Sequence, residues 1–284
     1  MEKRFNTQQI RETDSVALNF LYKTAIGRIL LKPLIRPTAS KLAGYYLNHP
    51  ISKPLIQRFV QKHGISLAEY QPKDYASFND FFMREIKASA RPFPKEEEVI
   101  VAPCDGKLTI YPIEADSIFR IKNSLYSMKE LLGDAELGAQ WSGGTAAIFR
   151  LTPDDYHHYY FIDDGEVLHQ QAFSGKFHTV RPIAIQNQPV FTQNTRECAI
   201  IETAHFGKIA QIEVGALLVG KIKNKPITGP CTRFEKKGWF EFGGSTVILL
   251  FQANKLIVDP EILANSRDNK ETVVQLGQVI GKRK

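Results

Sequence analysis

The sequence predicts an α+β protein in which N-terminal amphipathic helices precede a β-rich core, built as a barrel or a sandwich. Apolar side chains recur at three- and four-residue spacings in the first third of the chain. Short β-branched and aromatic runs, separated by Gly, Pro, Asn and Asp, fill the rest. The composition, 43% hydrophobic and 24% charged over 284 residues, is globular. We expect two domains: a basic helical region over 1–95 and a β-rich domain over 96–284.

Four helices are predicted in the first region. The first covers 17–32, an amphipathic stretch followed by Pro33 and Pro37. The second and third cover 38–48 and 51–63, and Gly64 ends the third. A fourth begins at Ser77, where Asp80 stands three residues on, as in a capping box.

Strands dominate from about residue 97 onward. Helical patterns between them are scarce, apart from a possible turn near Ser127–Leu132, which argues against a doubly wound βαβ sheet. The predicted strands are 107–113, 146–151, 159–162, 166–173, 198–204, 208–214, 239–242, 246–251 and 255–258.

The net charge of +7 lies in one part of the chain. Residues 1–70 hold eleven basic and four acidic side chains, and the other 214 residues are balanced. Basic amphipathic helices are typical of proteins that lie on an anionic membrane surface. The alternative is a helical cap on the β core with solvated basic faces. A nucleic-acid partner is not expected, because the β-rich part carries no excess of basic groups.

The sequence shows no targeting or spanning segment and no disulfide framework. The first fifteen residues lack an apolar stretch, and no run of 18 apolar residues occurs. Cys104, Cys198 and Cys231 match no metal-site spacing, so we expect buried thiols in a reducing compartment and no metal.

The segment Gly243-Gly244-Ser245-Thr246 leads directly into an apolar strand. No helix or lysine follows, so it is not a phosphate loop, and Val247 excludes the G-x-S-x-G elbow. One interpretation is a tight turn or bulge. The other is intramolecular chemistry, in which the Ser245 hydroxyl attacks the Gly244 carbonyl, given a base and a dry pocket.

Two further segments carry candidate partners for Ser245. APCDGKL (102–108) contains Asp105, which by itself suggests only a turn. RLTPDDYHHYYFIDDG (150–165) contains His157 and His158, of which only one can face a given site if the segment is a strand. Either histidine could be structural.

Taken in order, these three segments resemble the phosphatidylserine decarboxylase proenzyme family. Further blocks that resemble the family are SFNDFFMREIKASARPF (77–93), GKFHTVRPIAI (175–185), NTR (194–196) and VGALLVG (214–220). The resemblance implies self-cleavage at Gly244-Ser245 into chains 1–244 and 245–284, with Ser245 converted into a covalent pyruvoyl cofactor. It further implies decarboxylation of phosphatidylserine to phosphatidylethanolamine and carbon dioxide.

The resemblance also implies residue roles. His157 would act as the base on Ser245, oriented by Asp105, and as a proton donor during decarboxylation. Many members have Tyr-His-Arg-x-His where this chain has Tyr-His-His-Tyr-Tyr, so Tyr160 stands where a second His often sits. Tyr160 and His178 are weaker candidates for the substrate pocket, and the charge of Arg196 suggests contact with the substrate phosphate.

Partners and alternatives follow from the same resemblance. We expect the two fragments to form a heterodimer that dimerises further, bound peripherally to the cytoplasmic face of a membrane. Two alternatives predict an uncleaved chain. One is a serine hydrolase that uses Ser245, His157 and Asp105, and the other is a non-enzymatic lipid-binding protein.

Overall fold

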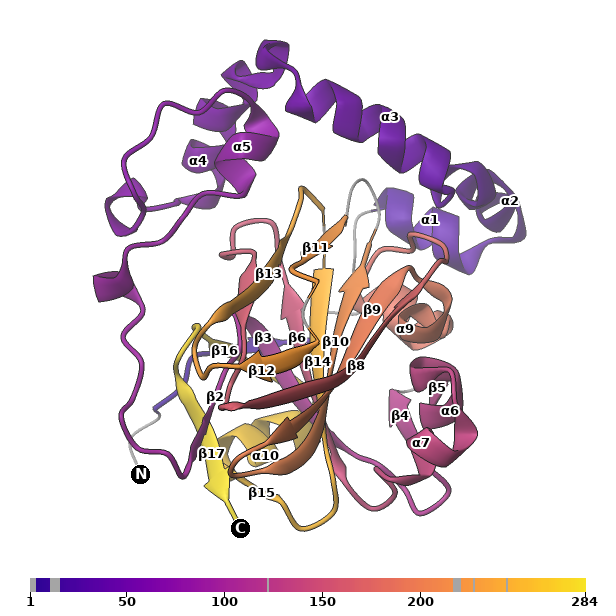
Figure 1. Ribbon diagram of the computed structural model, residues 1–284. Helices are drawn as coiled ribbons and strands as arrows, with labels where there is room; N and C mark the ends of the chain where they lie inside the picture. The colour runs from indigo at the N-terminus through magenta and orange to yellow at the C-terminus, as the bar shows by residue number, and fades with distance from the viewer. Residues whose placement is uncertain (1–3, 11–15, 122, 217–220, 227, 244) are drawn as a thin grey trace.

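The predicted α+β class is confirmed, with antiparallel sheets packed as an open sandwich. In Figure 1 the N-terminal helices arch over one end of the sheets, and the two termini lie near the opposite end. The structure is a computed structural model that describes residues 4–10, 16–121, 123–216, 221–226, 228–243 and 245–284.

The helices follow the predicted pattern with one break. The predicted helix 17–32 is divided at Thr24, whose Oγ1 accepts a hydrogen bond from Gly27 N and caps the second part. Gly64 ends the fourth helix in the left-handed conformation, and Ser77 caps the fifth by accepting from Asp80 N. These helices are α1 (Val16–Lys23), α2 (Ala25–Leu34), α3 (Pro37–Asn48), α4 (Pro54–His63) and α5 (Phe78–Phe82).

A nine-stranded antiparallel sheet forms the framework, and β14 is its central strand. All seven residues of β14 are buried, which explains its nearly uninterrupted apolar sequence. In spatial order the strands are β1 (Thr7–Gln9), β16 (Lys270–Val274), β3 (Gly106–Pro112), β6 (Thr145–Leu151), β14 (Ser245–Phe251), β10 (Gly207–Gly215), β9 (Arg196–Thr203), β8 (Gly165–Phe173) and β12 (Gly229–Cys231).

Different layers cover the two faces of this sheet. One face packs against two three-stranded sheets and α10 (Pro260–Arg267). These sheets are β11 (Ile222–Asn224), β13 (Lys236–Phe240) and β7 (His158–Tyr160), and β15 (Leu256–Val258), β17 (Val279–Arg283) and β2 (Val99–Val101). The other face packs against α1, α2, the hairpin of β4 (Ile118–Ile121) and β5 (Ser124–Ser127), and α6 (Met128–Leu132), α7 (Ala135–Ala139), α8 (Pro182–Asn187) and α9 (Val190–Gln193).

The first strand was not predicted. Thr7–Gln9 pairs with β16, so the start of the chain is joined to the large sheet and not only to the helices. Its polar sequence has no apolar alternation, because the strand lies at a sheet edge with all three residues exposed. The three cysteines are free and buried, as expected. Among the described residues, no helix is long and apolar enough to cross a bilayer.

Candidate active site

Ser245 is the first residue of the central strand β14. It pairs with Gly215 of β10 on one side and with Leu151 of β6 on the other. Its side chain is fully buried, and its Oγ has no hydrogen-bond partner among the described residues. Leaving a buried hydroxyl unpaired costs about 1–3 kcal/mol, so this hydroxyl calls for a functional explanation. Gly243 has a φ of 146°, which side chains disfavour. The predicted cleavage residue Gly244 lies outside the described residues.

Alternation along β14 divides the site between the two faces of the sheet. Ser245 shares a face with Val247 and Leu249, which belong to the core beneath β7 and β13. We call this the Ser245 face. Thr246 is also buried, with an unpartnered Oγ1, but it shares the opposite face with Ile248. The two neighbouring hydroxyls therefore point into different layers.

His157 points into the same layer as Ser245. Its backbone O accepts from Phe240 N at 2.9 Å, which continues the pairing of β7 with β13 by one residue. Because side chains alternate, His157 shares a face with Tyr159, which packs in the core of the Ser245 face. The loop that carries His157 leaves β6 at Leu151, directly opposite Ser245. Strand register thus brings the two residues to the same end of the sandwich.

The chemistry of His157 follows from its partners. Its Nδ1 lies 2.9 Å from the backbone O of Asp155. A carbonyl oxygen only accepts, so Nδ1 carries the hydrogen and Nε2 carries the lone pair. Nε2 is buried without a hydrogen-bond partner among the described residues. Burial lowers the pKa of His157 to about 3, so the ring is neutral at pH 7 and Nε2 is unprotonated.

His158 faces the opposite way, in agreement with the prediction that only one of the pair can face the site. Its Nε2 donates to Met83 O at 3.0 Å. Its ring stacks on Tyr156 at 4.7 Å and on Trp239 at 5.9 Å between centroids. Burial lowers its pKa to about 4. These contacts indicate a structural role.

Asp105 does not orient His157 as the sequence interpretation expects. Its carboxylate accepts two hydrogen bonds from Arg91, at 3.0 and 2.7 Å, and one from Leu276 N at 2.7 Å. The orienting group of His157 is the Asp155 carbonyl. Sequence reasoning missed Arg91 because the paired residues are fourteen positions apart and no local pattern links them.

Tyr160 lies close to Asp105, at the position where a second histidine was expected. Its backbone N donates to Pro103 O at 2.9 Å, and its hydroxyl lies 3.4 Å from that of Tyr156. Burial raises the pKa of Tyr160, and the nearby Asp105 carboxylate contributes to the rise. Tyr160 is therefore a neutral phenol, able to donate a proton but not to act as a base at pH 7.

His178 and Arg196 are not brought to Ser245. Arg196 is two residues from Cys198 on β9, so both lie on the face of the sheet opposite Ser245. Its three guanidinium nitrogens donate to the backbone oxygens of Leu131, Thr192 and Glu130. His178 Nδ1 lies 3.3 Å from the Tyr22 hydroxyl of α1, on that same side. Arg196 thus links the sheet to α6 and α9, whereas His178 contacts α1.

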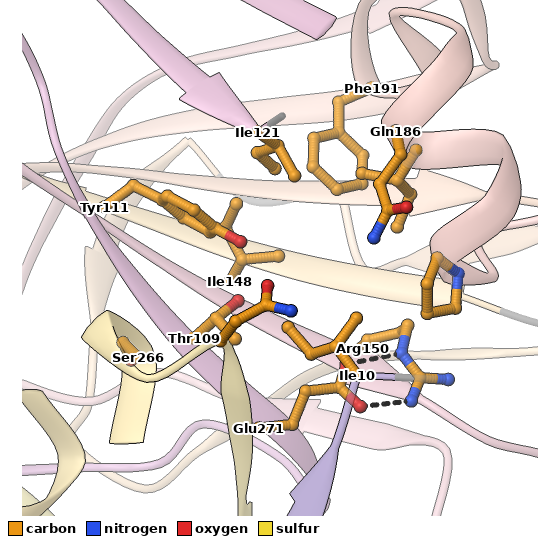
Figure 2. A pocket seen from close by; sticks show the side chains of 13 residues that line it. Ile10, Thr109, Tyr111, Ile121, Ile148, Arg150, Gln186, Phe191, Ser266 and Glu271 are labelled. Carbon is orange, nitrogen blue, oxygen red and sulfur yellow. Dashed lines mark hydrogen bonds and ion pairs between the residues drawn. The ribbon is translucent and has the colours of Figure 1, made fainter. Parts of the chain in front are cut away.

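A pocket also lies on the face opposite Ser245. Figure 2 shows Tyr111, Ile148 and Phe191 lining it, with Arg150 and Glu271 joined by two hydrogen bonds at its edge. Arg150 stands opposite Thr246 in the register of β6 and β14. The pocket contains neither Ser245 nor His157, so it contributes nothing to their chemistry.

A segment from the predicted fourth helix connects the two halves of the site. We call residues 78–84 the α5 segment. The Phe82 ring packs against His157 at 4.2 Å and against Phe242 at 5.0 Å between centroids. Asn79 Oδ1 accepts from Phe242 N at 2.9 Å. The segment therefore contacts both the histidine loop and the connection between β13 and Ser245, a role the sequence did not reveal.

A second polar group lies on the Ser245 face. Glu213 is diagonal to Ser245, since it pairs with Val247, and it is fully buried. Lys237 Nζ lies 2.6 Å from Glu213 Oε2, and Asn224 Nδ2 donates to the same oxygen at 2.9 Å. Sequence patterns do not identify this pair. Over the part of the chain that the structure describes, no cluster of three or more potential metal ligands occurs.

Comparison with known proteins identifies the family. The family model for phosphatidylserine decarboxylase matches residues 78–282. The chain belongs to the phosphatidylserine decarboxylase family. It is 44% identical to phosphatidylserine decarboxylase proenzyme 2 of Clostridium acetobutylicum, over 93% of this chain and 91% of that protein. It is 38% identical to the proenzymes of Ruminiclostridium cellulolyticum (98% and 94% covered) and Chlamydia trachomatis (97% and 94%).

The resemblance inferred from the motifs is thereby confirmed. The match to the phosphatidylserine decarboxylase model includes Asp105, His157 and Ser245, and it begins at Phe78, the first residue of the α5 segment. Helices α1–α4 precede the match. The alignment with the Ruminiclostridium proenzyme nevertheless covers 98% of this chain, so most of this helical region has an aligned counterpart.

Proposed function

We propose that this chain decarboxylates phosphatidylserine to phosphatidylethanolamine and carbon dioxide, with a pyruvoyl group that it makes from its own Ser245. The observation that carries the proposal is that a buried hydroxyl and a buried imidazole nitrogen, both without partners among the described residues, lie in the same layer. Neither Ser245 Oγ nor His157 Nε2 has a hydrogen-bond partner among the residues that the structure describes, and the His157 ring is neutral. The proenzyme names of the relatives support self-processing.

The proposed self-cleavage uses these two side chains. Ser245 Oγ attacks the carbonyl carbon of Gly244 while His157 Nε2 takes the hydroxyl proton. The proton passes to the departing amide nitrogen, so an ester replaces the peptide bond. Elimination then removes the Ser245 Hα and breaks its Cβ–O bond, which releases chain 1–244 with a carboxylate end. Water replaces the nitrogen at Cα, ammonia leaves, and a ketone remains at residue 245.

The surroundings of Ser245 fit a pyruvoyl group. The position is buried, which protects a reactive ketone, and no charged side chain among the described residues hydrogen-bonds to Oγ. When formed, the group supplies a carbonyl that binds the substrate amine and accepts the electron pair released with carbon dioxide. His157 Nε2 carries a free lone pair and would exchange protons with the substrate amine and with the carbon that loses carbon dioxide.

The two proposed fragments would stay together as a heterodimer. Fragment 245–284 contributes the central strand β14, which pairs along its whole length with both β6 and β10. Its strands β16 and β17 pair with β3 and β2. Dissociation would expose the core on both faces of the sheet. Further dimerisation stays a prediction that light scattering can test.

We also propose that α1–α3 bind peripherally to an anionic membrane on the cytoplasmic side. Large apolar side chains are exposed there beside exposed Arg28, Lys32, Arg36 and Lys41. This combination is typical of interfacial helices. The exposed apolar residues are Val16, Phe20, Ile26, Ile29, Leu30, Leu34, Leu42, Tyr45 and Tyr46.

Denaturing mass spectrometry of the purified protein tests the proposal. We expect two species, 1–244 and a 245–284 fragment with a blocked N-terminus, and carbon dioxide release from phosphatidylserine. Ser245→Ala should abolish both. Thr246→Val is the matched control, because it removes an equally buried and unpartnered hydroxyl that points to the other face; it should still be processed.

An intact, active wild-type chain would contradict the proposal and favour a serine hydrolase. The strand that follows Ser245 argues against that alternative, since the nucleophile elbow of a hydrolase leads into a helix. Vesicle binding without carbon dioxide release, unchanged in Ser245→Ala, would indicate a lipid-binding protein instead.

A further inference from the structure

Arg84, the last residue of the α5 segment, is a buried cation without an anionic partner among the described residues. Its side chain is 1% exposed. Among the described residues, Nη2 alone forms hydrogen bonds, to the Tyr70 hydroxyl at 3.2 Å and to the backbone O of Asp154 at 3.3 Å. Nε and Nη1 are buried and have no partner in the part of the chain that the structure describes. An unpaired buried charge strongly destabilises a fold. Its presence at Arg84 therefore indicates that an anion binds there.

Its surroundings hold the guanidinium in place. The group lies over the Tyr70 ring at 4.4 Å and against the Phe81 ring at 4.9 Å. These contacts stabilise the cation and restrict its rotation, but they provide no hydrogen-bond acceptor for Nε and Nη1. A preorganised fork of N–H groups is the arrangement that recognises carboxylate and phosphate oxygens.

Arg84 also lies at the candidate active site. Phe82, two residues earlier, packs on the His157 ring, and Asp154, which accepts from Arg84, belongs to the loop that ends at His157. The charge of Arg84 acts on His157, where it adds to the lowering of the pKa caused chiefly by burial.

Other buried arginines are already satisfied. Arg91 binds Asp105, and Arg150 binds Glu271 through two hydrogen bonds. Arg196, which the sequence suggested for the phosphate, donates from all three nitrogens to backbone carbonyls on the far face of the sheet. We propose that Arg84 binds the phosphodiester anion of the phospholipid substrate. This inference rests on the proposed function.

The substrate carries two anions, a carboxylate and a phosphodiester. Pairing Arg84 with the carboxylate would stabilise a charge that must leave as carbon dioxide, and so would oppose the reaction. The phosphodiester keeps its charge throughout. An interaction that is equal in ground and transition states changes KM and leaves kcat unaltered.

The position of the α5 segment suits a lipid headgroup. Phe78 and Phe81 form a common cluster with Leu47 of α3 and with Ile56 and Phe59 of α4. Helix α3 is one of the proposed membrane-binding helices. Through its contact with Phe81, Arg84 is connected to the helices at which a phospholipid would arrive.

The experiment compares Arg84→Gln and Arg84→Lys with wild type in detergent–phosphatidylserine micelles, after mass spectrometry has given the processed fraction. For Arg84→Gln we expect KM to rise about 10- to 100-fold, as for loss of a charge-assisted contact, with kcat within about threefold. Arg84→Lys keeps the positive charge but loses the planar guanidinium, so its KM should rise less than that of Arg84→Gln. The exposed Arg267→Gln on α10 is the matched control and should match wild type.

Inhibition by phosphatidylethanolamine distinguishes the two anions, because this product retains the phosphodiester and lacks the carboxylate. We expect its inhibition constant to weaken by the same factor as KM. Unchanged inhibition with an altered kcat would assign Arg84 to the carboxylate. An unchanged KM in a processed variant overturns the inference, as does failure of both folded variants to self-cleave. A wild type that neither self-cleaves nor releases carbon dioxide would instead refute the proposed function.

Discussion

Helices α1–α3 and the central strand β14 are both rich in large apolar side chains, but the helices expose many of theirs to solvent and the strand buries all of its own. Leu42 of α3 is 75% exposed, whereas Leu249 of β14 is fully buried. The contrast is reversed for polar groups. The basic residues of α2 and α3 lie in solvent, while Ser245 and His157 are buried with unpartnered atoms. Both arrangements cost stability, and they are the features on which the proposed membrane contact of the helices and the proposed chemistry of Ser245 depend.

The largest effect that would break this comparison is expected at His157. His157→Asn keeps a donor for the Asp155 carbonyl but removes the Nε2 base, so self-cleavage should slow by about 10²- to 10⁴-fold. The time course of fragment appearance measures it. His158→Gln is the control, because its amide can still donate to Met83 O. Equal effects of both substitutions would show that the histidines act through packing alone.

The next effect concerns matched leucines in the two regions. On the uncleaved Ser245→Ala background, Leu249→Ala should lower the free energy of unfolding by about 2–5 kcal/mol, because it leaves a cavity in the core. Leu42→Ala should change it by less than about 0.5 kcal/mol. Urea denaturation measures both. A large loss of stability in Leu42→Ala would favour the helical-cap interpretation of α3.

A pH dependence of stability would sharpen the description of the buried site. The pKa of His157 falls from 6.5 to about 3 on folding, chiefly by burial, so the unfolded state binds more protons between these values. Its stabilising contribution is complete above pH 6.5 and is lost as the pH falls toward 3. On the Ser245→Ala background, His157→Asn should reduce the slope of unfolding free energy against pH by about 1.4 kcal/mol per unit near pH 4–5.5. An unchanged slope would indicate that His157 is solvated.

The smallest single effect is expected at the basic surface of the helices. Lys41→Gln should weaken binding to vesicles with anionic lipid by about 1 kcal/mol, since each basic residue near such a surface contributes about that much. Co-sedimentation at low and high salt measures the loss, which should shrink as salt screens the charge. Carbon dioxide release from micellar substrate should stay unchanged. Vesicle binding that changes neither with the substitution nor with the salt concentration would show that charge does not contribute to binding of the helices to the membrane.

Much of the framework could be predicted from local sequence. Alternating apolar patterns located β3, β6, β9, β10 and β14, and glycine and capping signals located the ends of α4 and α5. Strand β1 was missed because a polar, exposed edge strand has no apolar periodicity. The domain boundary near residue 95 and the individual catalytic roles stay predictions.

The sequence by itself determined the family, the strand that begins at Ser245 and the concentration of positive charge in the first seventy residues, because each depends on residues close together in the chain. Only the tertiary structure decided which side chains meet. Asp105 pairs with Arg91 and not with His157, Arg196 lies on the far face, and Arg84 reaches the histidine loop seventy residues away. Such partners depend on strand register and on the packing of distant segments, and a single sequence without relatives carries no local signal of either.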